Sequence, residues 1–291
     1  MPVDREKALG ASLGEREAGW EVDDVILYHL GVGAGVPPTN PGELEYTYEK
    51  NLKVLPSFVV VAGGRRRAVI SGEGGGGFNL PGIEFNLAQL LHGEQDIEIH
   101  KTLPTSAETR SSGRVADVFD KGKAALVITE YENRDEAGDL LFTTRSSLFI
   151  RGEGGFGGPS GPKVGNTPPE RDPDGVVESV TLPQQALLYR LSGDKNPLHA
   201  DPDFAKMAGF DQPIIHGLCS YGIACKAIVD HVLGGDPTRV ARYQARFAGI
   251  GFPGETCLTS YWEEGDKVLL RMDSKERSAP IITNAAITLR G

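Results

Sequence analysis

Cysteine is scarce in this chain. It has three cysteines among 291 residues, at positions 219, 225 and 257, and no two of them form a C-x-x-C pair. Disulfide-stapled domains and zinc ribbons need more cysteines at regular, closer spacings. We therefore expect reduced thiols in a cytoplasmic protein, with neither a disulfide framework nor a structural metal.

Long hydrophobic runs without charge are also lacking. The best candidate for a membrane span, Ile214–Leu233, is interrupted by His216, Lys226, Asp230 and His231. This stretch therefore resembles a buried helix more than a transmembrane one. The first seven residues are largely charged and contain no apolar core of a secretory signal. We expect neither secretion nor a membrane partner.

Positive charge is in deficit. Thirty Lys and Arg residues against 40 Asp and Glu residues give a formal net charge of −10. Nonspecific binding of nucleic acid needs a basic surface for the phosphates, so we expect no nucleic-acid partner. A small phosphate-bearing ligand held by a few local cations is still compatible with this charge. The glycine-rich segments lack the residues of a nucleotide-binding loop, because no Gly-Lys-Ser/Thr follows them.

The remaining composition is that of a globular protein. Hydrophobic residues make up 39% and charged residues 24% of the chain, and the length allows about two domains. A faint internal repeat supports this division. Residues 23–31 resemble residues 184–193, each like a short helix ended by glycine, and residues 141–152 resemble residues 281–291, each like a closing strand.

The two halves contain the same elements in the same order. Each has a helix candidate, Leu55–Ala62 or Leu218–Leu233, followed by strand candidates. The strands are expected near residues 95–103, 114–119, 124–134 and 140–150, and near residues 239–250, 256–263, 267–276 and 280–289. We predict an α+β fold with two repeats, each a long helix wrapped by an antiparallel sheet. The predicted limits are a first repeat at 1–158, a Gly/Pro-rich linker at 159–175, and a second repeat at 176–291.

The most informative stretch is Tyr189–His199, which carries a carboxylate and an imidazole around a glycine and a proline. Residues 184–191 are predicted to form a short helix that Gly193 ends. Asp194 then leaves the helix on a tight turn, from which its side chain can enter a pocket. The carboxylate of Asp194 is one half of a candidate acid/base pair.

Asn196 and His199 complete this turn. Asn196 precedes Pro197, which favours an extended backbone and leaves the Asn side chain to brace the turn by hydrogen bonding. The following Asp-Pro pair is a typical start for another short helix, predicted at residues 203–208. His199 is therefore expected on a connector between two helices, close to Asp194, where an imidazole can serve as acid or base.

Gly217 opens the long apolar helix of the second half. Its backbone N–H is among the first that no intrahelical carbonyl satisfies, and it lies at the positive end of the helix dipole. A glycine also lets a ligand carbonyl approach closely. Such a donor would stabilise the oxyanion of a reacting thioester.

Other interpretations of these residues exist. An Asp at a helix exit is often a turn residue, and a buried His is often a packing residue. Asp194, His199 and His216 could instead bind a metal, although no His-x-x-x-His or Cys-rich spacing supports this. His216 is expected to shape the turn before the helix. A serine nucleophile elbow is absent, because Leu218 stands two residues before Ser220.

The stretch Tyr189–His199 is similar to the hydratase 2 motif of the (R)-specific 2-enoyl-CoA hydratases, a MaoC-like family. Further segments resemble the hydratase 2 domain of peroxisomal multifunctional enzyme type 2, namely Leu91–Gln95, Asp117–Gly122, Gly154–Gly158 and Ala208–Asp211. The resemblance extends over nearly the whole chain. It implies a double hot-dog fold and hydration of trans-2-enoyl-CoA to (3R)-3-hydroxyacyl-CoA, without a cofactor and in a homodimer.

The resemblance also assigns the site residues. It makes Asp194 and His199 the catalytic pair, Asn196 their support and Gly217 the backbone donor to the thioester carbonyl. It places the ligand contacts on His92, Gly93, Lys121 and Phe247.

In the first half, residues 30–35 occupy the slot of the catalytic turn, with no Asp or His at the matching distance. We therefore expect one active site per chain and a first half that accommodates the acyl chain. Alternative functions are another hot-dog thioester enzyme, either a dehydratase of acyl carrier protein or a thioesterase, and a noncatalytic acyl-CoA-binding protein.

Overall fold

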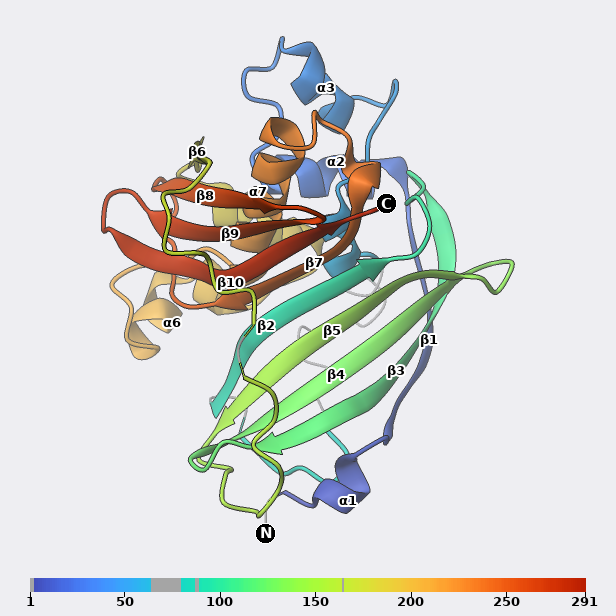
Figure 1. Ribbon diagram of the computed structural model, residues 1–291, viewed down its shortest axis with the longest axis vertical. Helices are drawn as coiled ribbons and strands as arrows, with labels where there is room; N and C mark the ends of the chain where they lie inside the picture. The colour runs from blue at the N-terminus through green and yellow to red at the C-terminus, as the bar shows by residue number, and fades with distance from the viewer. Residues whose placement is uncertain (1–2, 64–79, 87–88, 164) are drawn as a thin grey trace.

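The computed structural model describes residues 3–63, 80–86, 89–163 and 165–291. Its strands form one ten-stranded antiparallel sheet in the order β1-β3-β4-β5-β2-β7-β10-β9-β8-β6 (Figure 1). The first five strands in this order come from the first half of the chain and the last five from the second. The two halves therefore build two adjacent parts of one sheet.

The strands of the first half are β1 (Ser12–Trp20), β2 (Leu90–Ile99), β3 (Ala107–Asp120), β4 (Ala124–Asp135) and β5 (Leu140–Arg151). Those of the second half are β6 (Gly175–Val180), β7 (Val240–Phe247), β8 (Thr256–Glu264), β9 (Lys267–Ser274) and β10 (Ala279–Leu289). All eight predicted strands are confirmed, with shifted ends. β1 and β6, the two edge strands, were not predicted.

The helices of the first half are α1 (Arg5–Ala8), α2 (Val22–Gly31), α3 (Pro41–Thr47) and the 3-10 helix η1 (Pro56–Val60). The second half contains α5 (Gln185–Tyr189), η3 (Arg190–Ser192), η4 (Pro197–His199), α6 (Pro202–Met207), α7 (Gly217–His231) and η5 (Pro237–Arg239).

The two halves of the sheet meet where β2 pairs with β7, from Glu94 opposite Arg246 to Glu98 opposite Arg242. The Arg242 guanidinium also donates two hydrogen bonds to the Asp96 carboxylate across this seam, from Nε at 2.9 Å and from Nη2 at 2.6 Å. Backbone pairing and a two-point ion pair thus hold the repeats together.

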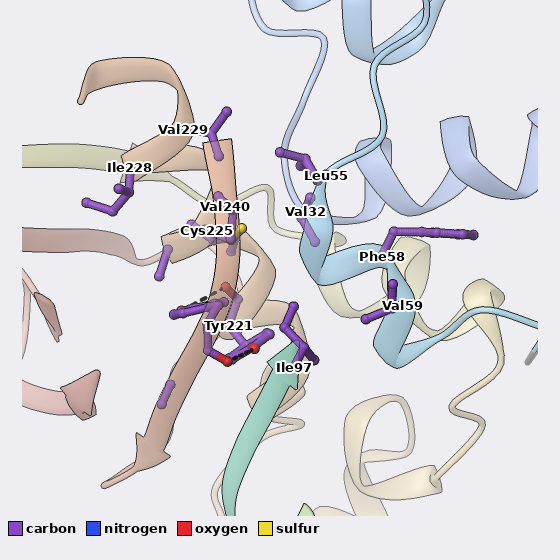
Figure 2. Packing of buried hydrophobic residues seen from close by; sticks show 14 of the residues in the cluster. Val32, Leu55, Phe58, Val59, Ile97, Tyr221, Cys225, Ile228, Val229 and Val240 are labelled. Atoms are coloured by element: carbon purple, nitrogen blue, oxygen red, sulfur yellow. Dashed lines mark hydrogen bonds between the residues drawn. The ribbon is translucent and has the colours of Figure 1, made fainter. Parts of the chain in front are cut away.

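The long helix α7 lies at the centre of the main core. Most of its residues are buried, as expected for a helix that is apolar on nearly all sides. Tyr221 of α7 and Tyr243 of β7 stack with ring centroids 3.9 Å apart, and each hydroxyl donates to the other's main-chain carbonyl. In Figure 2, Cys225 of α7 lies on the side toward Leu55 and the η1 residues Phe58 and Val59, whereas Ile228 points to the opposite side of the cluster.

The prediction of a long helix in the first repeat is wrong for the residues that the structure describes. The candidate Leu55–Ala62 forms only the five-residue η1. Pro56 starts this turn, but the β-branched run Val59, Val60 and Val61 follows it, and such residues lose side-chain freedom in a helix. The first part of the sheet therefore surrounds a short helical turn where the second surrounds α7.

The segment between the repeats is attached to the body at both ends. At its start, the Asp120 carboxylate accepts hydrogen bonds from the N–H groups of Gly155 and Gly157. Further on, Asn166 donates to Gln244 of β7, and Asn284 of β10 donates to the carbonyl of Gly165. The segment therefore crosses the face of β7 and β10 opposite to α7, as Figure 1 also shows.

In the described part of the chain, no helix combines the length and the hydropathy that crossing a membrane requires.

Candidate active site

The turn that carries Asp194 follows α5 and η3 directly. Gly193 has a φ of +132°, a backbone conformation that side chains disfavour, so a glycine is needed where the chain leaves the helix. Asp194 Oδ1 accepts a hydrogen bond from the N–H of Asn196 at 3.1 Å, and Asn196 Oδ1 accepts one from the N–H of Leu198 at 3.0 Å. The predicted role of Asn196 as a brace of the turn is confirmed.

His199 ends η4 and is 8% exposed. Its Nδ1 lies 2.8 Å from the main-chain carbonyl oxygen of Ile214, which can only accept a hydrogen bond. Nδ1 therefore carries the proton, and in the neutral ring Nε2 keeps its lone pair. Burial lowers the pKa of His199, although the bond to Ile214 and the charge of Asp194 oppose this shift. The ring is thus held neutral with Nε2 ready to accept a proton.

Asp194, His199 and His216 form the densest group of ionisable side chains at this turn. One donor atom from each residue lies within 4.8 Å of the others. The rings of His199 and His216 stack, with centroids 3.7 Å apart and planes inclined by 25°. Asp194 and His199 are brought together by the predicted turn. His216 joins them from the connection that leads to α7.

A metal site made of these three residues was one alternative. Two imidazoles stacked nearly in parallel direct their lone pairs alongside each other, whereas a shared tetrahedral ion needs converging ligands. In addition, Nδ1 of His199 and Nε2 of His216 already lie within hydrogen-bonding distance of main-chain carbonyls. This arrangement favours acid/base chemistry over metal ligation.

Gly217 is the first residue of α7, as predicted. Among the described residues its N–H has no hydrogen-bond partner. A Cβ atom added at this position would lie 3.2 Å from Cδ1 of Phe247, so a side chain here would crowd the aromatic ring. The free N–H at the positive end of a fifteen-residue helix is a suitable donor to a developing oxyanion.

His92 and Phe247 lie next to this helix end. Their ring centroids are 5.0 Å apart in an edge-to-face arrangement. Burial lowers the pKa of His92 to about 4, and the charge of Asp194 partly opposes this, which places His92 within electrostatic range of the catalytic turn. Gly93 lies at the irregularity of β2 between His92 and Glu94, and a Cβ there would be 3.4 Å from the carbonyl oxygen of Ser147.

Lys121 is not brought to this group in the structure. It lies in the turn between β3 and β4, where its Nζ donates to the main-chain carbonyl of Ser160 and lies 5.8 Å from the ring centroid of Phe119. These contacts tie Lys121 to the segment that joins the repeats. A role in substrate binding is untested and stays a prediction.

Two contributions to this site were not predicted. The carbonyl of Ile214 fixes the tautomer of His199, but a main-chain atom has no sequence signature. Arg190 lies close enough for its charge to lower the pKa of both His199 and His216, and its Nε is buried without a hydrogen-bond partner in the described chain. The sequence signal that could have pointed to Arg190 is its position four residues before Asp194.

A small cavity lies behind the catalytic turn. Its volume is about 10 Å³, and it is lined by residues from β1, α2 and the η1 region together with Ser192. This is room for about one water molecule. Ser192 Oγ is buried and has no hydrogen-bond partner in the described chain. The cavity connects the residue next to Gly193 with the first repeat.

Comparison with known proteins places the chain among acyl-thioester enzymes. Residues 19–152 match the family described as the MFE-2 hydratase 2 N-terminal domain, and residues 164–285 match the MaoC-like domain. The chain is 45% identical over 282 residues to the enoyl-CoA hydratase ChsH3 of Mycobacterium tuberculosis, covering 97% of both proteins.

Solved structures agree with these matches. A MaoC-like dehydratase from Phytophthora capsici is 34% identical, with a TM-score of 0.85 and 98% of both chains covered. A Mycobacterium tuberculosis protein described as having a double hotdog fold is 11% identical, with a TM-score of 0.55 and 99% of both chains covered, which bears on the fold alone. The predicted α+β double hot-dog fold is confirmed.

Proposed function

Since the chain belongs to the family that joins an MFE-2 hydratase 2 N-terminal domain to a MaoC-like domain, we propose that it hydrates trans-2-enoyl-CoA to (3R)-3-hydroxyacyl-CoA. The protein is a hydro-lyase of the enoyl-CoA hydratase type, as its relatives are. One observation carries the finer proposal: Asp194 and the neutral His199 converge beside the free N–H of Gly217.

In the proposed mechanism Asp194 and His199 hold one water molecule over the double bond. Nε2 of His199 accepts one hydrogen of this water, and the oxygen of Asp194 that is not bound to Asn196 accepts the other. As the water oxygen bonds to C3, it keeps one hydrogen and becomes the hydroxyl group, while its other proton passes to the Asp194/His199 pair. The pair delivers a proton to C2 from the same face, so the net addition is one water molecule and no external acid is consumed.

Gly217 supplies the electrostatic part of the mechanism. Attack at C3 shifts electrons of the double bond toward the thioester carbonyl, whose oxygen becomes enolate-like. The N–H of Gly217 would donate to this oxygen and stabilise it by about 3–4 kcal/mol. Gly217 leaves space for the thioester carbonyl because it has no side chain. A Cβ atom at this position would lie 3.2 Å from Cδ1 of Phe247.

The substrate is proposed to be an acyl-CoA thioester. The reaction is proposed to need no cofactor, because it only moves a proton and adds water. Phe247 lies against Gly217 and contacts His92, and these two residues, with Gly93 next to His92 in β2, are proposed to line the acyl and thioester end of the site. Lys121, in the turn between β3 and β4, is also proposed to bind the substrate, through its ammonium group. A homodimer, a cytoplasmic location and the repeat limits at residues 158 and 175 are also proposals.

We propose that the first repeat makes room for the acyl chain. Where the sheet of the second repeat packs on the fifteen-residue α7, the sheet of the first packs, in the described part of the chain, on the five-residue η1. The cavity next to Ser192 reaches η1 and α2, but about 10 Å³ is too small for an alkyl chain. A long acyl group would therefore have to separate η1 from α2 on binding.

The test is a chain-length series of enoyl-CoA substrates that begins with crotonyl-CoA. Loss of absorbance at the enoyl thioester band without release of free CoA identifies a hydratase, whereas release of CoA identifies a thioesterase. We expect the 3R product and activity that persists beyond four carbons. A product of the S configuration would overturn the stereochemical proposal, and activity confined to four carbons would overturn the role of the first repeat.

Asp194→Asn and His199→Gln test the catalytic pair. Each change keeps the size of the side chain but removes its ability to exchange a proton, so we expect kcat to fall at least about a hundredfold. Circular dichroism should show an unchanged fold. Near-normal hydration of crotonyl-CoA by either variant would contradict the assignment.

A further inference from the structure

His216 is buried against two other aromatic rings at the start of α7. It is 1% exposed and stands directly before Gly217 as the N-cap residue. One face of its ring packs on His199, with centroids 3.7 Å apart, and Tyr189 contacts it with a centroid distance of 4.9 Å and an inclination of 51°. These rings come from η4 and α5, so His216 joins two segments that are separated from it in sequence.

The ring nitrogens of His216 have defined roles. Nε2 lies 3.3 Å from the main-chain carbonyl oxygen of Asp194, which can only accept, so Nε2 carries the proton and donates. Nδ1 is buried and has no hydrogen-bond partner in the described chain. His216 therefore does not cap α7 with its side chain but directs its one donor at the backbone of Asp194.

The residues that lead into α7 thus contact both members of the catalytic pair. The carbonyl of Ile214 holds Nδ1 of His199, while the ring of His216 supports the face of His199 and binds the backbone of Asp194. Gly217, the proposed oxyanion donor, follows immediately. Three parts of the proposed site are fixed by the four-residue segment from Ile214 to Gly217.

We propose that His216 is a positioning residue, which sets the separation and orientation of Asp194 and His199 without itself touching the substrate. This inference rests on the proposed hydratase function and deepens it. Positioning of a catalytic group by a packed and hydrogen-bonded neighbour is worth a large factor in rate, because small displacements of reacting groups are costly.

Burial is the main reason why the ring of His216 is neutral, which this role requires. Burial lowers the pKa of His216 to about 4, helped by His199 and Arg190 and opposed by the charge of Asp194. Tyr189 faces it as a neutral ring, since burial raises the pKa of that hydroxyl well above its usual range. A protonated His216 would place a cation against His199 and weaken the stack.

Two variants separate the functions of the ring. His216→Phe keeps an aromatic ring for stacking and loses the donor to Asp194, whereas His216→Gln keeps a donor and loses the ring. We expect each to lower kcat on crotonyl-CoA at least about tenfold with little change in KM. In His216→Gln the acidic limb of the kcat/KM profile should also move up by about half a pH unit, since His199 loses its apolar cover.

His29→Gln is the matched control. His29 is a fully buried histidine of the first repeat, and its Nδ1 lies 2.8 Å from the carbonyl oxygen of Tyr46. This variant should lose stability but keep the kcat and the pH profile of the wild type. If both His216 variants keep wild-type kcat and pH dependence, or if His29→Gln reproduces their kinetic effects, the inference is overturned.

A measurement on the unaltered protein decides the case where the variants do not fold or where hydration is not observed. Long-range 1H–15N spectra of the histidine rings should show His216 neutral and protonated at Nε2 at pH 7. A ring protonated at Nδ1, or a cationic ring, overturns the positioning role. Absence of hydration by the wild type would overturn the proposed function, whereas the ring spectrum still decides the geometry on which the role of His216 depends.

Discussion

The tautomer of His199 determines how the proposed reaction should depend on pH. Only the neutral ring with a free Nε2 can accept a proton from water, and burial lowers the pKa of His199 below its ordinary value. A lowered pKa extends the neutral form to more acidic solution. We therefore expect the acidic limb of the kcat/KM profile to lie below pH ~6.5, the ordinary value for histidine. The profile for crotonyl-CoA between pH 4 and 9 checks this, and a limb above pH ~7 would contradict it.

The oxyanion donor can be removed without removing the helix. Gly217 is the first residue of α7, a position where proline is tolerated because its N–H has no intrahelical acceptor. Gly217→Pro should therefore lower kcat about a hundredfold or more. Gly217→Ala is the matched control, because it keeps the N–H and adds one methyl group close to Phe247. Equal kcat for the two variants would show that the N–H is not the donor.

At the residue scale, the sequence predicts the turn better than its surroundings. Asp194, Asn196 and His199 are close in sequence, so local turn chemistry was enough to place them together. His92 and Phe247 reach the site through strand pairing over long sequence distances, and only the family resemblance pointed to them. The side chain of His216 was expected to shape a turn, with metal binding as the alternative, because no local pattern reveals a ring stack.

At the element scale, α7 is held against α3 by a mostly buried charge cluster. The ammonium of Lys226 lies 2.7 Å from Glu43 and 2.8 Å from Asp230, and these side chains are 13%, 15% and 23% exposed. Tyr46 also donates to Asp230 at 2.7 Å. Lys226→Met would leave two carboxylates without their cation in a region of low solvent access. We expect the free energy of unfolding to fall by about 2–4 kcal/mol, measured by urea denaturation.

Lys275→Met provides the control for this change. Lys275 pairs with Glu178 on the surface, where the two side chains are 51% and 54% exposed. Water screens such a pair, so its loss should change stability by less than about 1 kcal/mol. If the two substitutions cost the same, the cluster around Lys226 does not act as a buried ion pair.

The predictions of elements failed where the pattern was weak. β1 and β6 form the two edges of the sheet, and β1 contains Glu15, Arg16 and Glu17 in succession, which breaks the alternation of a half-buried strand. The apolar run at Leu55–Ala62 was ambiguous, because periodicity alone does not separate short helices from strands. By contrast α7 was predicted from its length and its nearly continuous apolar surface.

At the scale of the whole molecule, the internal repeat predicts two similar halves, and the sheet shows how they join. The repeat places α2 and α5 at equivalent positions, and in the structure they pack together: a Cβ at Gly31 would lie 3.1 Å from Cα of Tyr189. This contact was not predictable, since a repeat defines the halves but not their interface. Through this contact the first repeat packs against α5, the helix that leads into the catalytic turn.

Buried neutral histidines should also make the whole fold sensitive to acid. The pKa of His29 and that of His216 are each lowered to about 4, mainly by burial, against about 6.5 in the unfolded chain. Below pH ~6.5 the unfolded chain therefore binds more protons than the folded protein. The stability contributed by each histidine is complete above pH ~6.5 and is lost as the pH falls toward 4, at up to about 3 kcal/mol per group.

We expect the free energy of unfolding in urea to fall by about 2 kcal/mol for each of these histidines between pH 7 and pH 5. His29→Gln removes one such group, so the variant should be less stable than the wild type at pH 7 but should lose about 2 kcal/mol less on acidification. His29 lies in the first repeat and His216 at the catalytic turn of the second. A single urea transition that shifts as a whole in His29→Gln would mean that both repeats unfold together. If the wild type were equally stable at the two pH values, these imidazoles could not be buried in their neutral form.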